Sequence, residues 1–327
     1  MVDSKTVHIA LASDQNYVMP LTVALCSVAA NCDKSRKLVF YVIQSGIHSH
    51  LRRKVESSLR RTACTNTSIH WLEAPTEQLG NLKIVSRYLT ALTYAKVLLP
   101  DILPNELDRV LFLDSDVVAT ADLSQLWDLP LGDKALFAAR DRIGWVGAPG
   151  GLSNHRELNI PPDTKYFNSG VLYINLQKWR EKKISERIIS YIRKNWEILR
   201  MEDQEALNAV LFDDWGELPF EWNWQIPWRY FRNGMRIMAW VPQAGRTNII
   251  HFTCAEKPWL PGCDVAERIQ FFHYLDQTEW AGWRVPIHKE VFGRILHSIQ
   301  DLRFILGDYR RRVADWGAAE SIHRFDT

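Results

Sequence analysis

The sequence lacks the features that mark secreted and membrane-spanning proteins. The N-terminal stretch MVDSKTVHIALASD is too polar to hold the apolar core of a signal peptide. The most apolar early run, residues 18–30, is shorter than a membrane-spanning helix and contains Pro20 and Thr22. These absences predict a cytoplasmic protein.

Cysteine is scarce and the net charge is small. The five cysteines are scattered and form no Cys-x-x-Cys pair, and a chain of 327 residues is large enough to fold without disulfides. This pattern is typical of a reducing compartment. The net charge is only +2, so no strong field draws nucleic acid to the protein, and we expect no nucleic-acid partner.

Two glycine-rich signatures are also missing. Neither Gly-x-Gly-x-x-Gly nor Gly-x-x-x-x-Gly-Lys-Ser/Thr occurs, which argues against a dinucleotide-dependent oxidoreductase and against a P-loop enzyme. We interpret the glycine-rich stretch at residues 144–151, with Pro161 and Pro162 behind it, as a mobile connection within one domain. Hydrophobic residues at 46% and charged residues at 24% argue against disorder.

What the sequence contains is an alternation of short apolar runs with helical patterns. This alternation predicts βαβ units, and therefore an α/β fold with a mostly parallel central sheet flanked by helices. In such sheets ligands bind beyond the carboxyl ends of the strands. We expect strands at 7–12, 37–44, 67–72, 109–113, 135–139, 170–175 and 247–250, and helices at 21–30, 50–61, 88–99, around Trp179, at about 184–199 and over 201–208.

The sharpest chemical signal is Asp114-Ser115-Asp116, directly after the apolar run RVLFL. Two carboxylates at positions i and i+2 beyond a strand can converge on one hard divalent cation. Such a cation neutralises the phosphates of a nucleotide diphosphate, whose departure is the energetic problem in sugar transfer. The alternative is a turn in which the aspartates bind their own backbone.

The segment HFTCAEKPW, residues 251–259, follows another β-like run. The imidazole of His251 is a suitable third ligand for Mn²⁺, and Lys257 can pair with a phosphate as a point charge. A hydrogen-bonded core histidine beside a surface lysine has the same spacing. The residues alone leave both interpretations open.

Two further segments, YFNSGV at 166–171 and MEDQ at 201–204, carry amides and carboxylates at predicted junctions of loops with a strand or a helix. Such groups can bind sugar hydroxyls in a partly apolar pocket. The simpler interpretations are that Asn168 is a turn residue and that Asp203 caps a helix.

Together these segments resemble glycosyltransferase family 8, which includes bacterial lipopolysaccharide α-galactosyl- and α-glucosyltransferases. The resemblance covers roughly residues 7 to 260. It implies a GT-A fold with a Rossmann-like sheet, and a retaining enzyme that moves glucose or galactose from a UDP-sugar to a glycan or lipid-linked acceptor. The segments that carry it are HIALASDQNY, LTYAKVLLPDILP, DRVLFLDSDVV, LWDLPLGDKALFAARD, YFNSGVLYINLQKW, MEDQEALN and IIHFTCAEKPW.

The resemblance also implies roles for individual residues. Lys96 departs from the family pattern, in which many members have an Arg that approaches the donor; a Lys keeps the charge but loses the planar fork. Gln204 is a poor nucleophile, so we favour a route in which the leaving diphosphate takes the proton of the acceptor on the same face. The implied metal ligands for Mn²⁺ (or Mg²⁺) are Asp114, Asp116 and His251; the nucleotide and donor contacts are Asp14, Asn16, Lys96, Ser115 and Lys257; and the residues around the donor sugar are Asp141, Asn168, Asp203 and Gln204, with Gln204 nearest the anomeric carbon.

Two rival functions fit parts of the pattern. A nucleotidyltransferase that makes nucleotide-sugars usually has a glycine-rich N-terminal loop, and residues 10–17 contain no glycine. A protein that only binds a nucleotide-sugar would not need Asp114, Asp116, His251 and Lys257 all intact. No residue distinguishes glucose from galactose as the donor sugar, or identifies the acceptor. Trp215, Trp222, Trp224 and Trp228 could stack on acceptor sugars, and burial in the core is the alternative for each.

The chain beyond residue 285 has a different character. Apolar residues recur at helical spacing from Val291 to Leu306, and residues 289–312 hold six basic and three acidic side chains. We therefore divide the chain into a catalytic domain, residues 1–285, and a basic amphipathic helical extension, residues 286–327. Such a helix could lie peripherally on the inner face of an anionic membrane, or it could pack on the catalytic domain or in a homodimer.

Overall fold

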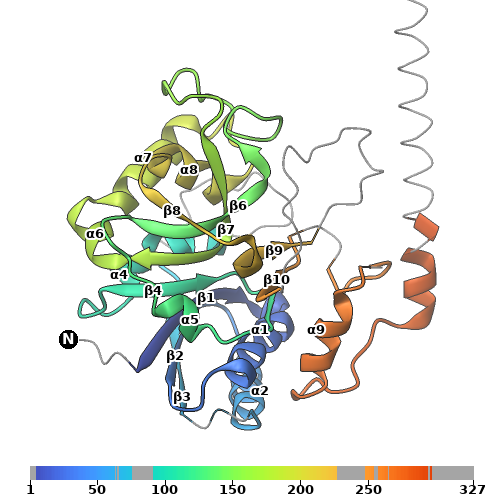
Figure 1. The fold of residues 1–327 in the computed structure, drawn as a ribbon. Helices are drawn as coiled ribbons and strands as arrows, with labels where there is room; N and C mark the ends of the chain where they lie inside the picture. Colours follow the sequence, from blue (N-terminus) through green and yellow to red (C-terminus); the bar gives the residue numbers. More distant parts are fainter. Residues whose placement is uncertain are drawn as a thin grey trace, which may run out of the picture.

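The computed structural model describes residues 5–62, 64, 66–75, 91–226, 247–253, 257–263, 265–293, 295 and 296. Its centre is a seven-stranded sheet with the strand order β3-β2-β1-β4-β7-β6-β8 (Figure 1). Four neighbouring pairs are parallel, whereas β7 runs antiparallel to both β4 and β6. The mostly parallel sheet is confirmed. Its strands are β1 (Thr6–Asp14), β2 (Lys37–Ser45), β3 (Thr67–Glu73), β4 (Arg109–Leu113), β6 (Leu136–Trp145), β7 (Lys165–Asn175) and β8 (Trp215–Leu218).

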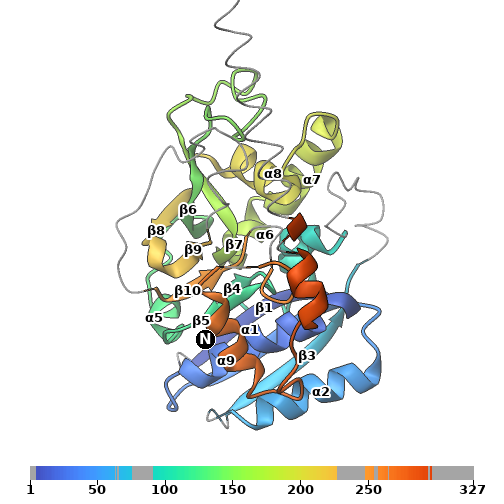
Figure 2. The same ribbon diagram turned by 90° about the vertical axis from the view of Figure 1, so that its right-hand side faces the viewer.

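Strand β2 shows why several of these runs are continuously apolar. Leu38 and Phe40 belong to the core on one face of the sheet, and Val39 and Tyr41 belong to the core on the other. Successive side chains of a strand point to opposite faces, so a strand covered on both sides needs apolar residues at every position. Helices cover both faces (Figure 2): α1 (Val18–Asn31) and α2 (Ser49–Arg60) on one, and α6 (Leu176–Glu181), α7 (Ile184–Asn195) and α8 (Glu202–Leu211) on the other.

A second, three-stranded sheet follows β4. In it β5 (Val117–Ala119) pairs antiparallel with β10 (Ile249–His251), and β10 pairs parallel with β9 (Trp224–Gln225). The register places His251 opposite Val117. Because Val117 directly follows Asp116 in the chain, this pairing brings the histidine to the two aspartates from a distant part of the sequence.

The helix predicted over residues 88–99 has a different form. Residues 88–90 lie outside the described part; η2 (Ala91–Leu98) is a 3₁₀-helix, and α4 (Leu99–Ile102) follows it. Side chains three residues apart line up in a 3₁₀-helix. Thr93 and Lys96 are such a pair, and both contact the carboxylate of Asp203. The 3₁₀ winding therefore brings both side chains to Asp203, a contact that the hydrophobic periodicity of the sequence does not reveal.

The predicted boundaries of other elements differ more modestly. Strands β6 and β7 are longer than predicted, and α7 ends four residues before residue 199. The short elements that complete the description are η1 (Gln15–Tyr17), α5 (Ser124–Trp127), η3 (Phe220–Asn223) and α9 (Arg268–Leu275).

The described chain ends at the start of the predicted extension, where residues 287–293, 295 and 296 are helical. Glu290 of this helix accepts hydrogen bonds from Arg268 Nη1 (2.9 Å) and from Gly262 N (3.2 Å). Hydrogen bonds thus connect the first turns of the extension to residues 262 and 268. Among the described residues of the extension, the apolar side chains that are more than half exposed are Ile287, Val291, Phe292 and Ile295.

Residues 297–327, which make up most of the predicted amphipathic extension, lie outside the described residues, as does Trp228. Among the residues that are described, no helix combines the length and the apolar character needed to cross a membrane.

Candidate active site

The candidate site lies beyond the carboxyl ends of β1 and β4, where ligands bind in sheets of this kind. Asp114 directly follows β4, and Asp116 directly precedes β5. The loop between them is held on both sides: Asp114 N donates to Gly170 O (2.8 Å) and Phe252 N donates to Asp116 O (3.0 Å). The two carboxylates therefore stand on a loop held between β7 and the segment after β10.

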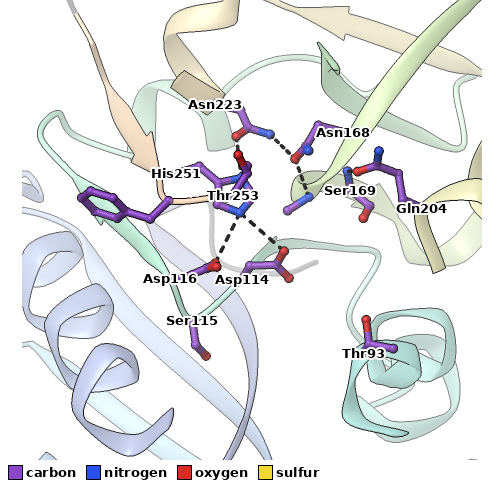
Figure 3. Close-up of polar contacts among 12 residues, drawn as sticks. Thr93, Asp114, Ser115, Asp116, Asn168, Ser169, Gln204, Asn223, His251 and Thr253 are labelled. Atoms are coloured by element: carbon purple, nitrogen blue, oxygen red, sulfur yellow. Dashed lines mark hydrogen bonds and ion pairs between the residues drawn. The ribbon is translucent and has the colours of Figure 1, made fainter. Parts of the chain in front are cut away.

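Asp114, Asp116 and His251 converge on one point (Figure 3). Each offers a ligand atom, and the three atoms lie within 4.8 Å of one another. His251 Nε2 is 3.3 Å from Asp116 Oδ1 and 3.7 Å from Asp114 Oδ2. Asp116 Oδ1 is buried, and among the described residues it makes no hydrogen bond. A buried carboxylate oxygen in this state suits a cation ligand.

Gly170 keeps the space in front of these ligands open. A Cβ at this position would lie 2.1 Å from His251 Cε1 and 2.8 Å from Asp114 Oδ2. Both distances are shorter than van der Waals contact, so any side chain here would displace the ligands. Two carboxylates, an imidazole and this open space fit a divalent cation.

Lys257 neutralises one of the two aspartates. Its Nζ donates to Asp116 Oδ2 (2.5 Å) and to the carbonyl of Phe252. Burial alone would raise the pKa of Asp116, but the charges of Lys257 and His251 hold that pKa well below its ordinary value. Asp116 is therefore ionised throughout the neutral range.

Lys96 connects the other aspartate with the predicted sugar residues. Its side chain is 3% exposed, and Nζ lies 3.1 Å from Asp114 Oδ1 and 2.9 Å from Asp203 Oδ2. It also donates to Ser169 O (3.1 Å). Burial alone would lower the pKa of Lys96, but the two carboxylates raise it above its ordinary value. The ammonium thus stays charged and binds the two acids to each other.

The residues predicted to surround the donor sugar form one buried network. Asp141 Oδ2 accepts from Asn168 Nδ2 (2.9 Å) and Gln204 Nε2 (3.2 Å). Ser169 joins the other members, because its N donates to Gln204 Oε1 (3.1 Å) and its Oγ donates to Asp203 Oδ2 (2.9 Å). The structure therefore brings all four predicted residues together.

The two simpler interpretations of these residues are wrong. Asn168 lies within strand β7, not in a turn. Asp203 lies inside α8, whose N-cap is Met201, and its carboxylate contacts Thr93, Ser169 and Lys96 in place of the helix end. Tertiary contacts explain both positions better than local capping does.

The predicted nucleotide residues Asp14, Asn16 and Ser115 have local partners. Asp14 Oδ1 caps η1 by accepting from Asn16 N (2.9 Å) and Tyr17 N (3.2 Å). Ser115 Oγ donates to Ala12 O (2.7 Å), which anchors the aspartate loop to β1. Contact of these three residues with a nucleotide stays a prediction.

Five further residues contribute to the site, and the sequence alone does not reveal their roles: Tyr17, Thr93, Ser169, Gly170 and Asn223. Asn223 is fully buried and bridges His251 and Asn168. Tyr17 stands after the capped turn, with its ring edge-on to Trp259 at 5.6 Å between centroids. Gly170 belongs to the segment YFNSGV, but no local signal shows which distant groups a residue faces.

The three described tryptophans of the predicted cluster pack within the protein. Trp222 is 7% exposed, and Trp215 stacks obliquely on Phe167 at 5.0 Å between ring centroids. Trp224 meets Phe220 edge-on at 5.5 Å. For Trp222, its low exposure and its place in the hydrophobic core confirm packing in the core, the alternative to acceptor stacking.

Comparison with known proteins agrees with this architecture. The family model of Glycosyl transferase family 8 matches residues 8–263. The chain is 30% identical over 287 residues to General stress protein A of Bacillus subtilis, covering 86% of this chain and 96% of that protein. It is 27% identical over 263 residues to the Lipopolysaccharide 1,2-glucosyltransferase of Escherichia coli K12, covering 78% and 73%. The crystal structure of galactosyltransferase LgtC with donor and acceptor sugar analogs matches with a TM-score of 0.69 at 26% identity, over 86% of this chain and 98% of that one.

Proposed function

The chain belongs to glycosyl transferase family 8, and from this premise we propose that it moves glucose or galactose from a UDP-sugar to a glycan or lipid-linked acceptor of the lipopolysaccharide type, forming an α-linkage. That it is a glycosyltransferase with a GT-A fold follows from the family match and the likeness to LgtC. The observation that carries the finer proposal is the cluster of Asp114, Asp116 and His251 beside Lys257.

The cluster is proposed to hold Mn²⁺, with Mg²⁺ as the second candidate. When bound, such a cation neutralises negative charge on the departing diphosphate. Lys257 adds a positive charge directly beside Asp116. Its side chain is flexible, so the ammonium can turn toward a phosphate oxygen of the bound nucleotide. The uridine is proposed to lie near the turn of Asp14 and Asn16, with Tyr17 beside it.

Retention is proposed to proceed on one face of the sugar, without a protein nucleophile. The amide of Gln204 is neutral, and both of its ends are held, by Ser169 N and by Asp141. The carboxylate of Asp203 is held on both oxygens, by Thr93 on one and by Ser169 and Lys96 on the other. A nucleophile must leave such partners to attack, so these groups are better suited to orienting the sugar hydroxyls.

The proposed lipid-linked acceptor is supported by exposed apolar side chains. Ile287, Val291, Phe292 and Ile295 expose apolar surface at the start of the extension, which suits peripheral contact with an anionic membrane that carries a lipid-linked acceptor. The division at residue 285, a cytoplasmic location and a homodimer stay predictions.

The proposal is tested by UDP release from UDP-glucose and UDP-galactose, with Mn²⁺ or with EDTA. We expect turnover of one sugar that needs the metal. Asp116→Asn should abolish it, because the amide loses the charge that the cation requires, whereas Asp276→Asn on the surface should not. If UDP and Mn²⁺ bind but neither sugar is consumed or transferred, the protein is a nucleotide-sugar-binding protein. Synthesis of a UDP-sugar from UTP would identify a nucleotidyltransferase instead.

A further inference from the structure

Asn223 is a buried amide that contacts both halves of the site. It lies at the end of η3, next to β9, and is fully inaccessible to solvent. Its Oδ1 is 2.9 Å from His251 Nδ1, and its Nδ2 donates to Asn168 Oδ1 (2.8 Å) (Figure 3). It is thus positioned between a metal ligand and a sugar-pocket residue.

The direction of each hydrogen bond in this chain follows from one backbone group. Gly170 N–H can only donate, and it donates to Asn168 Oδ1 (3.0 Å), which therefore must be the oxygen of that amide. The opposite end of Asn168 is then the NH₂ group, and it donates to the carboxylate of Asp141. Asn223 faces the oxygen of Asn168, so Asn223 must present its own NH₂ group there. Its oxygen is left for His251.

The oxygen of Asn223 also determines which ring nitrogen of His251 carries a hydrogen. An amide oxygen can only accept, so Nδ1 of His251 must carry a hydrogen. In the neutral ring Nε2 is then a bare lone pair, and it faces Asp116 Oδ1 at 3.3 Å. Two lone-pair atoms at that distance repel each other unless a positive charge lies between them, either a proton on the ring or a metal cation. The arrangement agrees with Asp116 Oδ1 making no hydrogen bond among the described residues.

We infer that Asn223 is a positioning residue, which fixes His251 with its hydrogen on Nδ1 and its Nε2 toward the metal, and which couples that ligand through Asn168 to the sugar pocket. The inference rests on the proposed function for the identity of the metal site. Metal-bound histidines commonly donate their second N–H to a neighbouring oxygen, which orients the ring and strengthens the ligand. Here the oxygen belongs to an amide whose other end holds Asn168.

Two substitutions separate the two contacts. Asn223→Leu keeps a similar volume and removes both hydrogen bonds. Asn223→Asp keeps an oxygen for Nδ1–H but cannot donate to Asn168 Oδ1 when ionised, so only the link to the sugar pocket is broken. Asn154→Leu is the matched control, because Asn154 is also buried and its side chain, among the described residues, bonds only to Tyr191 and Asn195, away from the Asn168–Asn223–His251 hydrogen bonds.

The first measurement is nitrogen NMR of the full-length protein labelled with ¹⁵N-histidine, without metal at pH 9, with His251→Gln to identify the resonances. We expect a hydrogen on Nδ1 in the wild type and in Asn223→Asp, and movement of that hydrogen toward Nε2 in Asn223→Leu. A bare Nδ1 in the wild type would overturn the inference.

The second measurement is Mn²⁺ binding in the presence of UDP, followed by the electron paramagnetic resonance signal of the free ion. Loss of the group that hydrogen-bonds a metal-bound histidine commonly weakens metal binding by about 10- to 100-fold, and we expect this for Asn223→Leu. Asn223→Asp should bind Mn²⁺ nearly as the wild type does, yet turn over UDP-sugar more slowly. Wild-type affinity in Asn223→Leu would refute the role.

Failure of the proposed function has a different signature. If the wild type does not bind Mn²⁺ at all, the metal site is wrong, and the NMR result alone decides whether Asn223 fixes the imidazole. If Asn154→Leu weakens Mn²⁺ binding as much as Asn223→Leu does, the effect is general destabilisation, and the specific role of Asn223 is refuted.

Discussion

The two halves of the candidate active site are built from the chain in different ways. The half proposed to bind the metal and the nucleotide (the nucleotide half) consists of Asp114, Asp116, His251 and Lys257, and its two aspartates stand on a single loop. The half proposed to bind the donor sugar (the sugar half) consists of Asp141, Asn168, Asp203 and Gln204, which come from β6, β7 and α8 and meet only in the folded protein. Within the described part of the chain, the nucleotide half presents an oxygen without a hydrogen bond, Asp116 Oδ1, whereas the polar groups of the sugar half largely bind one another. The nucleotide half therefore offers ligand atoms that suit a cation, whereas the side chains of the sugar half are held in place by one another without a ligand.

Among the described residues, three lie where the two halves meet. Lys96 joins Asp114 to Asp203, Asn223 joins His251 to Asn168, and Gly170 provides the space where the halves face each other. A change at one of these points should therefore affect both halves, whereas a similar change elsewhere should affect only stability.

The largest effect is expected for Gly170→Ala. The added methyl group would occupy the position 2.1 Å from His251 Cε1, so the ring must move. We expect Mn²⁺ affinity to fall by about 100-fold, the upper end of the range for a disturbed ligand shell, with UDP release falling at least as much. Electron paramagnetic resonance and a UDP-release assay measure the two quantities.

Gly216→Ala provides the matched control. Its added methyl group would lie 2.1 Å from Phe137 Cε1, an equally close approach within β8 and β6, away from the metal ligands. We expect a lower melting temperature with unchanged Mn²⁺ affinity. If both glycine variants lose Mn²⁺ binding equally, the open space at Gly170 has no special role.

The next largest effect is expected for Lys96→Met, which keeps the shape of the side chain but removes its charge. The carboxylates of Asp203 (7% exposed) and Asp114 (33% exposed) then lose their shared partner, and breaking a buried pair such as Lys96–Asp203 costs about 3–5 kcal/mol. Urea unfolding in EDTA measures the loss, and added Mn²⁺ should recover part of it by binding the native state.

Lys165→Met tests whether any lysine would behave in this way. The Lys165 side chain is 48% exposed and pairs with Glu217 at the surface, so its loss should cost about 1 kcal/mol or less. If the free energy of unfolding falls as little for Lys96→Met as for Lys165→Met, Lys96 does not hold the two halves together.

The smallest effect is expected on the pH dependence of stability, for Glu217, which pairs with Arg140 next to Asp141. Burial alone would raise the pKa of Glu217, but hydrogen bonds and charge from Lys165 and Arg140 hold it below its ordinary value. A lowered carboxyl pKa stabilises the native state above the unfolded value of about 4.3, and this stabilisation is lost as pH falls through the native pKa. Glu217→Gln should therefore be slightly less stable than the wild type at pH 7, and the difference should shrink at pH 3.5. Urea unfolding at both pH values checks this, and a difference that grows in acid would contradict it.

Local patterns in the sequence predict much of the fold. Runs such as RVLFL and KLVFYVIQ are apolar at every position because strands covered on both faces bury every side chain, and they appear as β4 and β2. The aspartate pair was also predictable, because two carboxylates separated by one residue after such a strand form a signal that needs no long-range information. The form of η2 and the antiparallel direction of β7 depend on contacts with distant elements, and the sequence pattern did not reveal them.

The sequence by itself determined the α/β architecture, the position of the aspartate pair and, through its resemblance, the family. Only the tertiary structure decided that His251 reaches those aspartates through the pairing of β10 with β5, that Lys96 serves two acids, and that Asn223 orients the histidine. The physical reason is range. Strand and helix propensities and hydrophobic periodicity act over neighbouring residues, whereas the polarity and direction of a buried hydrogen bond depend on which distant groups the fold places within about 3 Å.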